Sequence, residues 1–418
     1  MKRLLLGFLL MASAQAAELR IYPGFTEYRE SVPAAAGDYV VRLNQEQAAH
    51  LIPGTLNLEG PAVLQVIQQQ REVWLNSLEG KTVFLRDGEK VRPVELVRAE
   101  DLTVRDPATG RFFNVSYDRL EFPELPPAPE ERSMVQWNFK VDRPVPAQVS
   151  YLTRAYAWNP RYTLEVGAQD SSARLSAFAD IRNVTSRDVR VDKSELVAGE
   201  VNVEAANVYK GGVAMFESQD RAAPAAAPMP SIASGVEGSG VYRFAITEAF
   251  DLPARSTVSL PFLNPQVTLE RFVGTTRGFN PRSSKGKLDR MYRLRSDVLL
   301  PAGVVTVRDE GVLVGQTSIP DTAAREERVF GLGEDPDVSY NREVKVLSQT
   351  KDSARYQITL TLENAKKRAL RVEYKENFSG NVTLEGQAQR TAEGLSIEAN
   401  LPAGGKLTRS YTLTFQYR

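Results

Sequence analysis

The sequence predicts an all-β fold built from tandem antiparallel β modules, with a small N-terminal β module and a C-terminal immunoglobulin-like β-sandwich. Apolar and polar residues alternate with a period of two in many short runs, such as residues 19–22, 81–86, 356–362 and 407–415. Glycine, proline, asparagine and aspartate separate these runs, which is typical of antiparallel sheets with one buried face. Only residues 61–78 depart clearly from this alternation.

Residues 1–16 have the features of a secretory signal peptide. Lys2 and Arg3 form the charged start, residues 4–11 the apolar run, and residues 14–16 the small-residue cleavage site. The run is shorter than the roughly 20 apolar residues of a spanning helix, so we expect no transmembrane anchor in the mature chain. The chain has no cysteine, which excludes disulfides and lipid attachment at a cysteine. We therefore expect an exported protein of the periplasm or the outer cell envelope.

A mature chain of about 400 residues has room for two or three domains. We expect an N-terminal β-rich domain at 17–125, a central β-sandwich domain at 126–285, and the immunoglobulin-like β-sandwich domain at 286–418. The Pro-rich segment 122–129 predicts a linker or a sheet edge, because proline cannot donate ladder hydrogen bonds. The Ala/Pro-rich residues 221–240 predict a loop within the central domain.

Two parts of the N-terminal domain leave alternatives open. In residues 61–78, Val63, Ile67, Trp74 and Leu78 fall near a 3.6-residue period, which would suit an amphipathic helix. Valine and isoleucine dominate the stretch, so we favour strands, joined at the run of glutamines 68–70. Residues 78–123 hold several short strands, and we expect them to form a small closed barrel.

The charge of the chain is balanced, which bears on its partners. Lys and Arg number 52, as do Asp and Glu, and the sequence pI is near 6.7. Such a chain lacks the basic surface that binds phosphate backbones, so we expect no nucleic-acid partner. The hydrophobic fraction of 42% and the charged fraction of 25% are those of an ordinary globular protein.

Side chains for nucleophilic catalysis are scarce. The single histidine, His50, would be the only base for a serine nucleophile, and there is no cysteine nucleophile. We interpret His50 as an ordinary loop or strand-end residue. Carboxylates alone could support glycoside hydrolysis, but Asp180 and Glu200 are better interpreted as solvent-facing or turn residues. We therefore assign no catalytic residue, no cofactor-binding residue and no metal ligand.

Two clusters have a functional interpretation beside a structural one. Glu334, Asp335 and Asp337 could bind a hard cation such as calcium, but they lack the spacing of an EF-hand, and we favour a turn. The aromatic side chains near residues 151–162 could stack on sugar rings, but aromatic residues dominate sandwich cores, and we favour packing. This aromatic set comprises Tyr151, Tyr156, Trp158 and Tyr162, with Arg154 and Arg161 among them.

Four Asn-X-Ser/Thr triplets begin at Asn114, Asn183, Asn377 and Asn381. In a eukaryotic secreted protein they would suggest glycans. The bacterial character of the signal peptide favours chance occurrence. We expect Asn183 to open a turn.

The chain resembles the mucoidy inhibitor A-like family, whose C-terminal part is a domain of unknown function. The resemblance implies an exported, β-rich envelope protein without assigned catalytic residues. Longer members carry an N-terminal coiled coil, and no heptad run occurs here, so a coiled-coil partner is not expected. The residues that carry the resemblance are, in chain order, 78–83, 113–117, 150–164, 175–185, 196–199, 300–303, 313–316, 330–333, 362–364, Tyr374 and 401–404.

These observations together predict a non-enzymatic module of the cell envelope that binds an envelope or surface-layer protein. A carbohydrate-binding or carbohydrate-active protein that contacts cell-wall glycan is the main alternative, using Tyr156 and Trp158. A chaperone that clients bind by strand addition to an exposed sheet edge is a third possibility.

Overall fold

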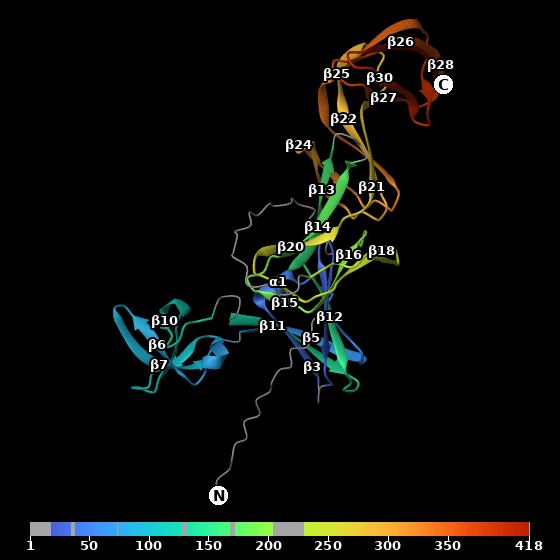
Figure 1. Ribbon diagram of the computed structural model, residues 1–418. Coiled ribbons are helices and arrows are strands. Elements are labelled where there is room, and N and C mark those ends of the chain that lie inside the picture. The colour runs from blue at the N-terminus through green and yellow to red at the C-terminus, as the bar shows by residue number, and fades with distance from the viewer. Residues whose placement is uncertain are drawn as a thin grey trace. The chain divides into compact units, whose positions relative to one another are not determined.

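The computed structural model describes residues 18–34, 38–72, 74–127, 132–167, 172–203 and 230–417. The prediction of an all-β fold is confirmed, because 64% of residues lie in strands and 4% in helices, and the sheets pack in a sandwich-like manner (Figure 1). The signal segment 1–16 and residues 221–229 of the expected loop lie outside the described residues.

The chain forms two compact units. The first contains the described residues up to Asn159 together with Asp180–Leu260, and the second contains Pro160–Ala179 and the chain from Pro261 onward. This division differs from the expected boundaries at 125 and 285. Strand β11 (Ser133–Val141) pairs with strands that precede residue 125, and β22 (Ser284–Ser296) runs across residue 285.

A seven-stranded sheet forms one layer of the first unit, in the order β17-β18-β16-β1-β2-β12-β4. Strands β1 and β16 pair in parallel, and the other ladders are antiparallel. The strands are β1 (Glu18–Ile21), β2 (Thr26–Val32), β4 (Asn57–Glu59), β12 (Ala147–Thr153), β16 (Lys193–Ala198), β17 (Val236–Gly238) and β18 (Val241–Ile246).

Strand β17 corrects the expectation of a loop as far as residue 240. Gly238 pairs with Val241, which leaves Ser239 and Gly240 as a two-residue hairpin loop. Both residues have positive φ, 56° and 81°, and two-residue hairpin turns of type I′ require this conformation. The glycine-rich sequence therefore forms a tight turn between two strands rather than an extended loop.

A three-stranded sheet, in the order β3-β11-β5, packs on the first layer. It consists of β3 (Tyr39–Asn44), β5 (Val63–Glu72) and β11, and helix α1 (Gln45–His50) follows β3. The preference for a strand in residues 61–78 is confirmed for β5, which a short 3-10 helix, η1 (Leu75–Leu78), follows. The expectation that glutamines 68–70 join two strands is wrong, because all three lie inside the continuous strand β5 and pair with β11. The core between the layers contains buried Tyr39, Leu43, Leu58, Trp137, Phe139, Ala147, Val149 and Tyr151.

Residues between β5 and β11 form a separate five-stranded sheet in the order β10-β6-β7-β8-β9. Among the described residues this sheet begins at β10 and ends at β9, so it is open rather than the closed barrel that we expected. It encloses its own core, which includes Val83, Leu85, Val94, Leu96 and Val104. Its elements are β6 (Thr82–Asp87), β7 (Lys90–Arg98), β8 (Thr103–Arg105), β9 (Phe112–Asn114), η2 (Tyr117–Arg119) and β10 (Leu120–Glu121).

Another five-stranded sheet has the order β20-β14-β13-β23-β24, and β15 pairs with β19. Strand β13 pairs with β23 in parallel. The strands are β13 (Tyr156–Val166), β14 (Arg174–Asn183), β15 (Val189–Val191), β19 (Phe250–Leu252), β20 (Ser256–Leu263), β23 (Gly303–Asp309) and β24 (Val312–Ile319).

A nine-stranded sheet, in the order β28-β31-β26-β25-β22-β21-β27-β30-β29, dominates the second unit. Buried side chains of β26 and β31 share one core with those of β27 and β30, so the curved sheet supplies both walls of a sandwich (Figure 1). The strands other than β22 are β21 (Val267–Gly278), β25 (Glu327–Gln349), β26 (Ser353–Asn364), β27 (Leu370–Asn377), β28 (Asn381–Gly386), β29 (Gln389–Arg390), β30 (Gly394–Leu401) and β31 (Lys406–Gln416).

The strand order is duplicated along the chain. The run β18-β16-β1-β2-β12 matches the run β30-β27-β21-β22-β25 in order, and each contains one parallel ladder, β1 with β16 and β21 with β27. A hairpin follows in both cases, because β13 neighbours β14 and β25 neighbours β26. The sequences after the hairpins, Ile-Arg-Asn-Val-Thr-Ser-Arg-Asp-Val-Arg-Val (181–191) and Leu-Glu-Asn-Ala-Lys-Lys-Arg-Ala-Leu-Arg-Val (362–372), are also alike.

One buried asparagine has the same role in both copies of this repeat. The side-chain amide of Asn183 donates to the carbonyl oxygens of Arg187 and Pro253, at 2.8 and 3.0 Å. That of Asn364 donates to Arg368 and Pro402, at 2.9 and 2.8 Å. Each asparagine therefore fixes the end of its strand to a Leu-Pro-Ala loop far away in the sequence.

Candidate interaction surface

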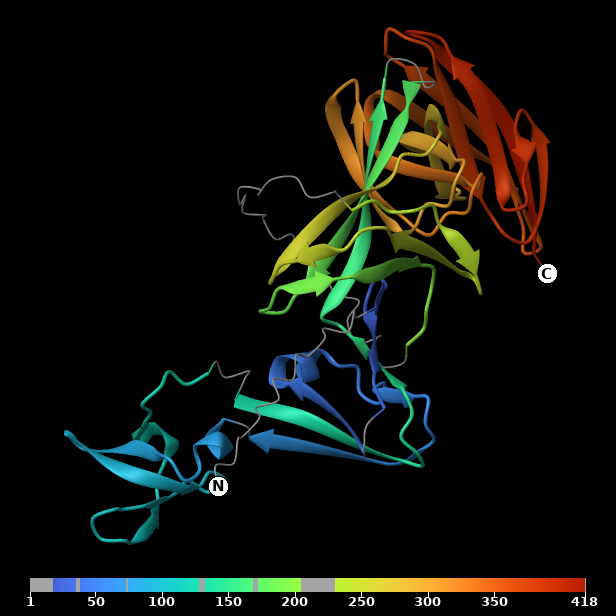
Figure 2. The same ribbon diagram turned by 60° about the horizontal axis from the view of Figure 1, so that its bottom comes forward.

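Strand β5 lies at the edge of the three-stranded sheet (Figure 2). Its described side chains are exposed. From Val63 to Gln70 every side chain is exposed, and Leu64, Val66 and Ile67 are 63%, 47% and 43% accessible. No charged residue occurs between Val63 and Gln70. Folded proteins usually protect an edge strand with charges, proline or a short length, so this edge has the character of an interaction site.

Pairing with β11 fixes the direction of the β5 side chains. Val66 pairs with Phe139 and Gln68 with Trp137, and both β11 side chains belong to the core. Val66 and Gln68 therefore point to the core face of the sheet, whereas Gln65, Ile67 and Gln69 point to the other face. The register shifts between Val63 and Gln65, so Leu64 is the extra residue of a bulge.

A groove of about 490 Å³ opens on the core face, between β5, β11 and the chain that follows α1. Buried Trp137 forms part of its lining, and none of its lining side chains is charged. The lining residues are Ala48, Leu51, Pro53, Gly54, Leu56, Val66, Gln68, Val135 and Trp137.

Local hydrogen bonds hold the wall of the groove that α1 supplies. Asn44 caps α1, because its Oδ1 accepts the Gln47 backbone N–H at 2.8 Å while the Gln47 side chain accepts the Asn44 N–H at 3.0 Å. After the helix, the Ile52 N–H donates to the Leu152 carbonyl oxygen at 2.8 Å, and Gly54 has a positive φ of 76°. The groove is therefore a preformed feature of the fold.

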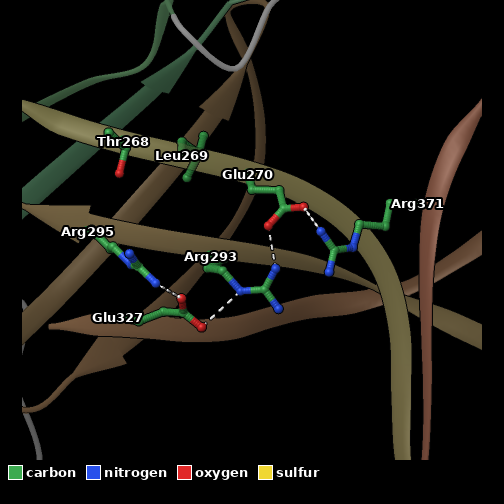
Figure 3. Close-up of a pocket in the computed structure, with 7 residues that line it drawn as sticks. All are labelled: Thr268, Leu269, Glu270, Arg293, Arg295, Glu327 and Arg371. Carbon is green, nitrogen blue, oxygen red and sulfur yellow. Dashed lines mark hydrogen bonds and ion pairs between the residues drawn. The ribbon is translucent and has the colours of Figure 1, made fainter. Parts of the chain in front are cut away.

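A second hollow, of about 410 Å³, lies in the second unit and is strongly charged (Figure 3). At its centre, Arg293 contacts Glu270 and lies 3.0 Å from Glu327 and 2.8 Å from buried Glu373. Arg371 lies 2.7 Å from Glu270. Although burial alone would lower the pKa of Arg293, its hydrogen bonds to Glu373 and Glu270 raise it. The hydrogen bond from Arg295 lowers the pKa of Glu327.

The charges of this second hollow are therefore neutralised by one another. Each of its three guanidinium groups has a carboxylate partner (Figure 3). An incoming anion would have to replace these internal partners. The cluster is consequently best explained as a network of ion pairs that joins neighbouring strands. Strand β5 with its groove is the stronger candidate for a binding site.

The aromatic side chains that the sequence singled out belong mainly to the core. Trp158 is fully buried, and its Nε1 donates to the Val197 carbonyl oxygen at 3.0 Å. Tyr162 is also fully buried and donates to the Pro301 carbonyl oxygen at 2.8 Å. The Tyr151 ring stacks on Tyr28, with centroids 4.8 Å apart, and Tyr156 is half-buried.

The two arginines among these aromatic residues have structural contacts. The Arg161 guanidinium lies 5.4 Å from the centroid of the Phe178 ring. The backbone N–H of Arg154 donates to the His50 carbonyl oxygen at 2.9 Å.

The single histidine and the two singled-out carboxylates lie in three separate places. His50 is the last residue of α1, not a loop or strand-end residue, and the helix ends there with the Leu51 N–H donating to the Gln47 and Ala48 carbonyl oxygens. Asp180 accepts a hydrogen bond of 2.6 Å from the Ser259 hydroxyl. Glu200 is exposed after β16. The structure therefore does not bring these residues together.

The expectation of a turn at residues 334–337 is wrong. These residues lie within β25, where the register with β22 shifts between Lys287 and Leu288 and accommodates the extra residues as a bulge. Asp335 is buried, and its Oδ2 lies 2.7 Å from the Lys366 ammonium. Throughout the described ranges, no group of three or more His, Cys, Asp or Glu side chains is placed to bind a metal ion.

Three of the four Asn-X-Ser/Thr asparagines use their side chains within the fold. Asn183 is buried at the end of β14, so it closes a strand before the turn. The Asn114 amide donates to the Asp101 carbonyl oxygen at 2.9 Å, and that of Asn377 to Glu393 at 3.4 Å. Asn381 is exposed and begins β28.

Sequence reasoning missed the exposure of β5, and the uncharged run from Val63 to Gln70 was the signal that could have revealed it. Along the stretches that the structure describes, no helix is long and apolar enough to cross a membrane. No known family model matches the chain, and no curated protein matches it. The resemblance to the mucoidy inhibitor A-like family therefore stays a prediction.

Proposed function

We propose that this chain is an exported, non-enzymatic interaction module of the cell envelope. Its partner is another envelope or surface-layer protein, which it binds at the groove beside β5. The observation that carries the proposal is the combination of an uncharged, exposed strand with an uncharged groove that has buried Trp137 in its lining. Aromatic and aliphatic surfaces of this kind are typical of the energetically important centre of protein interfaces.

The nature of the groove favours a protein ligand over a charged small molecule. Its walls offer aliphatic carbon from Leu51, Leu56 and Val135, and only Gln68 contributes a polar side chain. Desolvating a charged group here would be unfavourable, because no side chain of opposite charge lines the groove. An apolar side chain of a partner would instead be stabilised by the removal of surface from water.

The carbohydrate-binding alternative depended most on Trp158, and the burial of this residue argues against it. Sugar recognition by stacking needs an exposed aromatic face, whereas Trp158 is fully buried and hydrogen-bonded. Tyr156 is half-buried and its pKa is raised mainly by burial. Trp158 and Tyr156 therefore do not support glycan binding by stacking.

Site-specific photo-crosslinking in the native envelope tests the proposal. A photoreactive residue in place of Gln68 would lie in the groove, and one in place of Gln69 provides the control on the opposite face of the same strand. We expect position 68 to capture one or two envelope proteins reproducibly, identified by mass spectrometry, and position 69 not to capture them. Equal labelling from both positions, or none from either, would contradict the proposal.

A further inference from the structure

We propose that two copies of this chain pair along the free edge of β5, antiparallel and with the two-fold axis at Ile67, to form a continuous six-stranded sheet. This inference rests on the proposed function, because the pairing would place the grooves of the two copies on the same face of the joined sheet. A homodimer would then present two binding grooves to the envelope partner side by side.

The backbone of β5 supplies the first argument. Within the described residues β5 is the terminal strand of the order β3-β11-β5, so one side of its backbone has no strand beside it. An unpaired edge offers a row of N–H and C=O groups to another strand. The bulge at Leu64 interrupts the regular pairing of β5. The regular part of this edge therefore runs from Gln65 toward the C-terminal end of the strand.

The side chains of β5 define what kind of strand can add to this edge. Both faces carry exposed apolar groups, with Val66 on the core face and Ile67 on the other. From Val63 to Gln70 there is no charge with which a charged strand could pair. An uncharged strand with apolar side chains on both faces therefore suits this edge best. β5 itself meets this requirement, so the edge is complementary to a second copy of itself.

The apolar side chain of Ile67 favours the register with the two-fold axis at this residue. The part of β5 that is both regular and uncharged is 65–70, and pairing about Ile67 uses residues 65–69 of each copy. Ile67 lies opposite its own counterpart, so that two exposed apolar side chains meet at the axis. Gln65 lies opposite Gln69, where the side-chain amides can hydrogen-bond to each other. Such a pair is the isologous contact that a two-fold dimer requires.

The orientation of the axis links the dimer to the groove. In an antiparallel pair with the axis perpendicular to the sheet, equivalent side chains of both copies lie on the same face. The Val66 and Gln68 side chains of both copies would therefore border two adjacent grooves. A partner with two suitable segments, or a repeating surface array, would bind such a dimer with increased avidity.

Disulfide trapping provides the first test, and the absence of native cysteine makes it specific. Ile67→Cys would place two cysteines opposite each other on the axis, at a Cα separation of about 5 Å that suits a disulfide. Gln70→Cys is the matched control, because its counterpart would be about 20 Å away along the strand. We expect mild oxidation of the purified full chain to give a covalent dimer of the Ile67→Cys variant and none of the Gln70→Cys variant.

Charge exchange at the axis provides the second test. We expect the Kd of the dimer, measured by sedimentation over a range of micromolar concentrations, to rise at least about tenfold in Ile67→Lys and in Ile67→Glu. An equimolar mixture of the two variants should associate as strongly as the original chain. Circular dichroism distinguishes a general loss of folding from a loss of dimerisation, and so does recovery of association in the mixture of the two variants. Ile67 lies outside the groove lining, so these substitutions do not alter the groove directly.

The outcomes separate this inference from the proposed function. A chain that stays monomeric at all concentrations, or an equal disulfide yield from the two cysteine variants, overturns the dimer even if position 68 still captures an envelope protein. Capture of a different protein by the Ile67→Cys variant, with no self-linked product, likewise overturns it. A trapped dimer without any envelope protein captured at position 68 leaves the dimer standing and overturns the proposed function.

Discussion

Arg342 and Glu376 form an ion pair inside the C-terminal sandwich. Their Nη2 and Oε1 atoms are 2.8 Å apart, and their side chains are 2% and 1% exposed. Arg342 also donates to the carbonyl oxygens of Asn280 and Arg282, and the Tyr411 hydroxyl donates to Glu376 at 2.7 Å. The pair connects β25 with β27, and the Tyr411 hydroxyl joins β31 to it.

Glu376→Gln should therefore destabilise the second unit strongly. The substitution leaves the Arg342 charge buried without its counter-charge, and such a loss costs about 3–5 kcal/mol of unfolding free energy. Glu385→Gln is the control, because the Arg355–Glu385 pair has a similar separation of 3.0 Å but side chains that are 47% and 60% exposed. We expect the control to change stability by less than about 1 kcal/mol in urea denaturation. A similar loss of unfolding free energy in both variants would contradict the claim that burial makes the Arg342–Glu376 pair more important for stability than the exposed pair.

Alkaline pH should also unfold the protein, because several tyrosine hydroxyls are buried. Burial raises the pKa of Tyr151, Tyr162, Tyr374 and Tyr411 above their ordinary value of 10.0. Above about pH 10 the unfolded chain loses these protons while the folded chain retains them, so the unfolding free energy falls as pH rises. Urea denaturation between about pH 8 and about pH 11 measures the decline.

A single tyrosine variant gives this pH prediction a control. Tyr162→Phe removes one hydroxyl, which donates to the Pro301 carbonyl oxygen. The variant should be less stable at neutral pH by about 1 kcal/mol, because that hydrogen bond is lost. Its alkaline decline should be shallower by up to about 1.4 kcal/mol per pH unit, the contribution of one proton. A decline of unchanged slope would show that Tyr162 already ionises in the folded state.

Trp158→Ala tests whether Trp158, one of the aromatic residues singled out in the sequence, belongs to the core. Trp158 is fully buried and hydrogen-bonded to Val197, so the truncation should cost about 3–5 kcal/mol. Thermal and urea denaturation measure the effect. An unchanged stability combined with lost retention on glycan matrices would restore the carbohydrate interpretation.

The repeated asparagines should act on separate loops. Asn183→Ala and Asn364→Ala each remove buried hydrogen bonds to backbone carbonyl oxygens, at a cost of about 2–4 kcal/mol. Hydrogen exchange should accelerate near Pro253 in the first variant and near Pro402 in the second. If one variant accelerated exchange at both loops equally, the two copies of the repeat would not act independently.

Much of the fold was predictable from local patterns, because alternation with a period of two reports directly on half-buried strands. β26, for example, alternates buried and exposed side chains almost throughout its length. The preference for valine and isoleucine also identified β5 correctly. The bulge at residues 334–337 was not predictable, because three acidic residues with a proline are equally typical of a turn, and only the partner strand β22 decides between the two.

The candidate site was the least predictable part. Local sequence indicates that β5 is a strand, but whether another strand covers it depends on pairings such as that of Trp137 with Gln68, across some 70 residues. The parallel ladders of β1 with β16 and β21 with β27 are similarly non-local. The matching segments 181–191 and 362–372 were visible in the sequence, but their shared role depends on the carbonyl oxygens that Asn183 and Asn364 contact.

The most direct test of the account is co-purification of envelope proteins with the full chain after cross-linking in native cells. Pro53→Lys and Gln68→Lys each place a cation in the groove, and Gln69→Lys places the same cation on the opposite face of β5. We predict that the original chain and Gln69→Lys retain the same one or two partners, and that both groove variants lose most of them. Undiminished retention by the folded groove variants would contradict a role for the groove in binding.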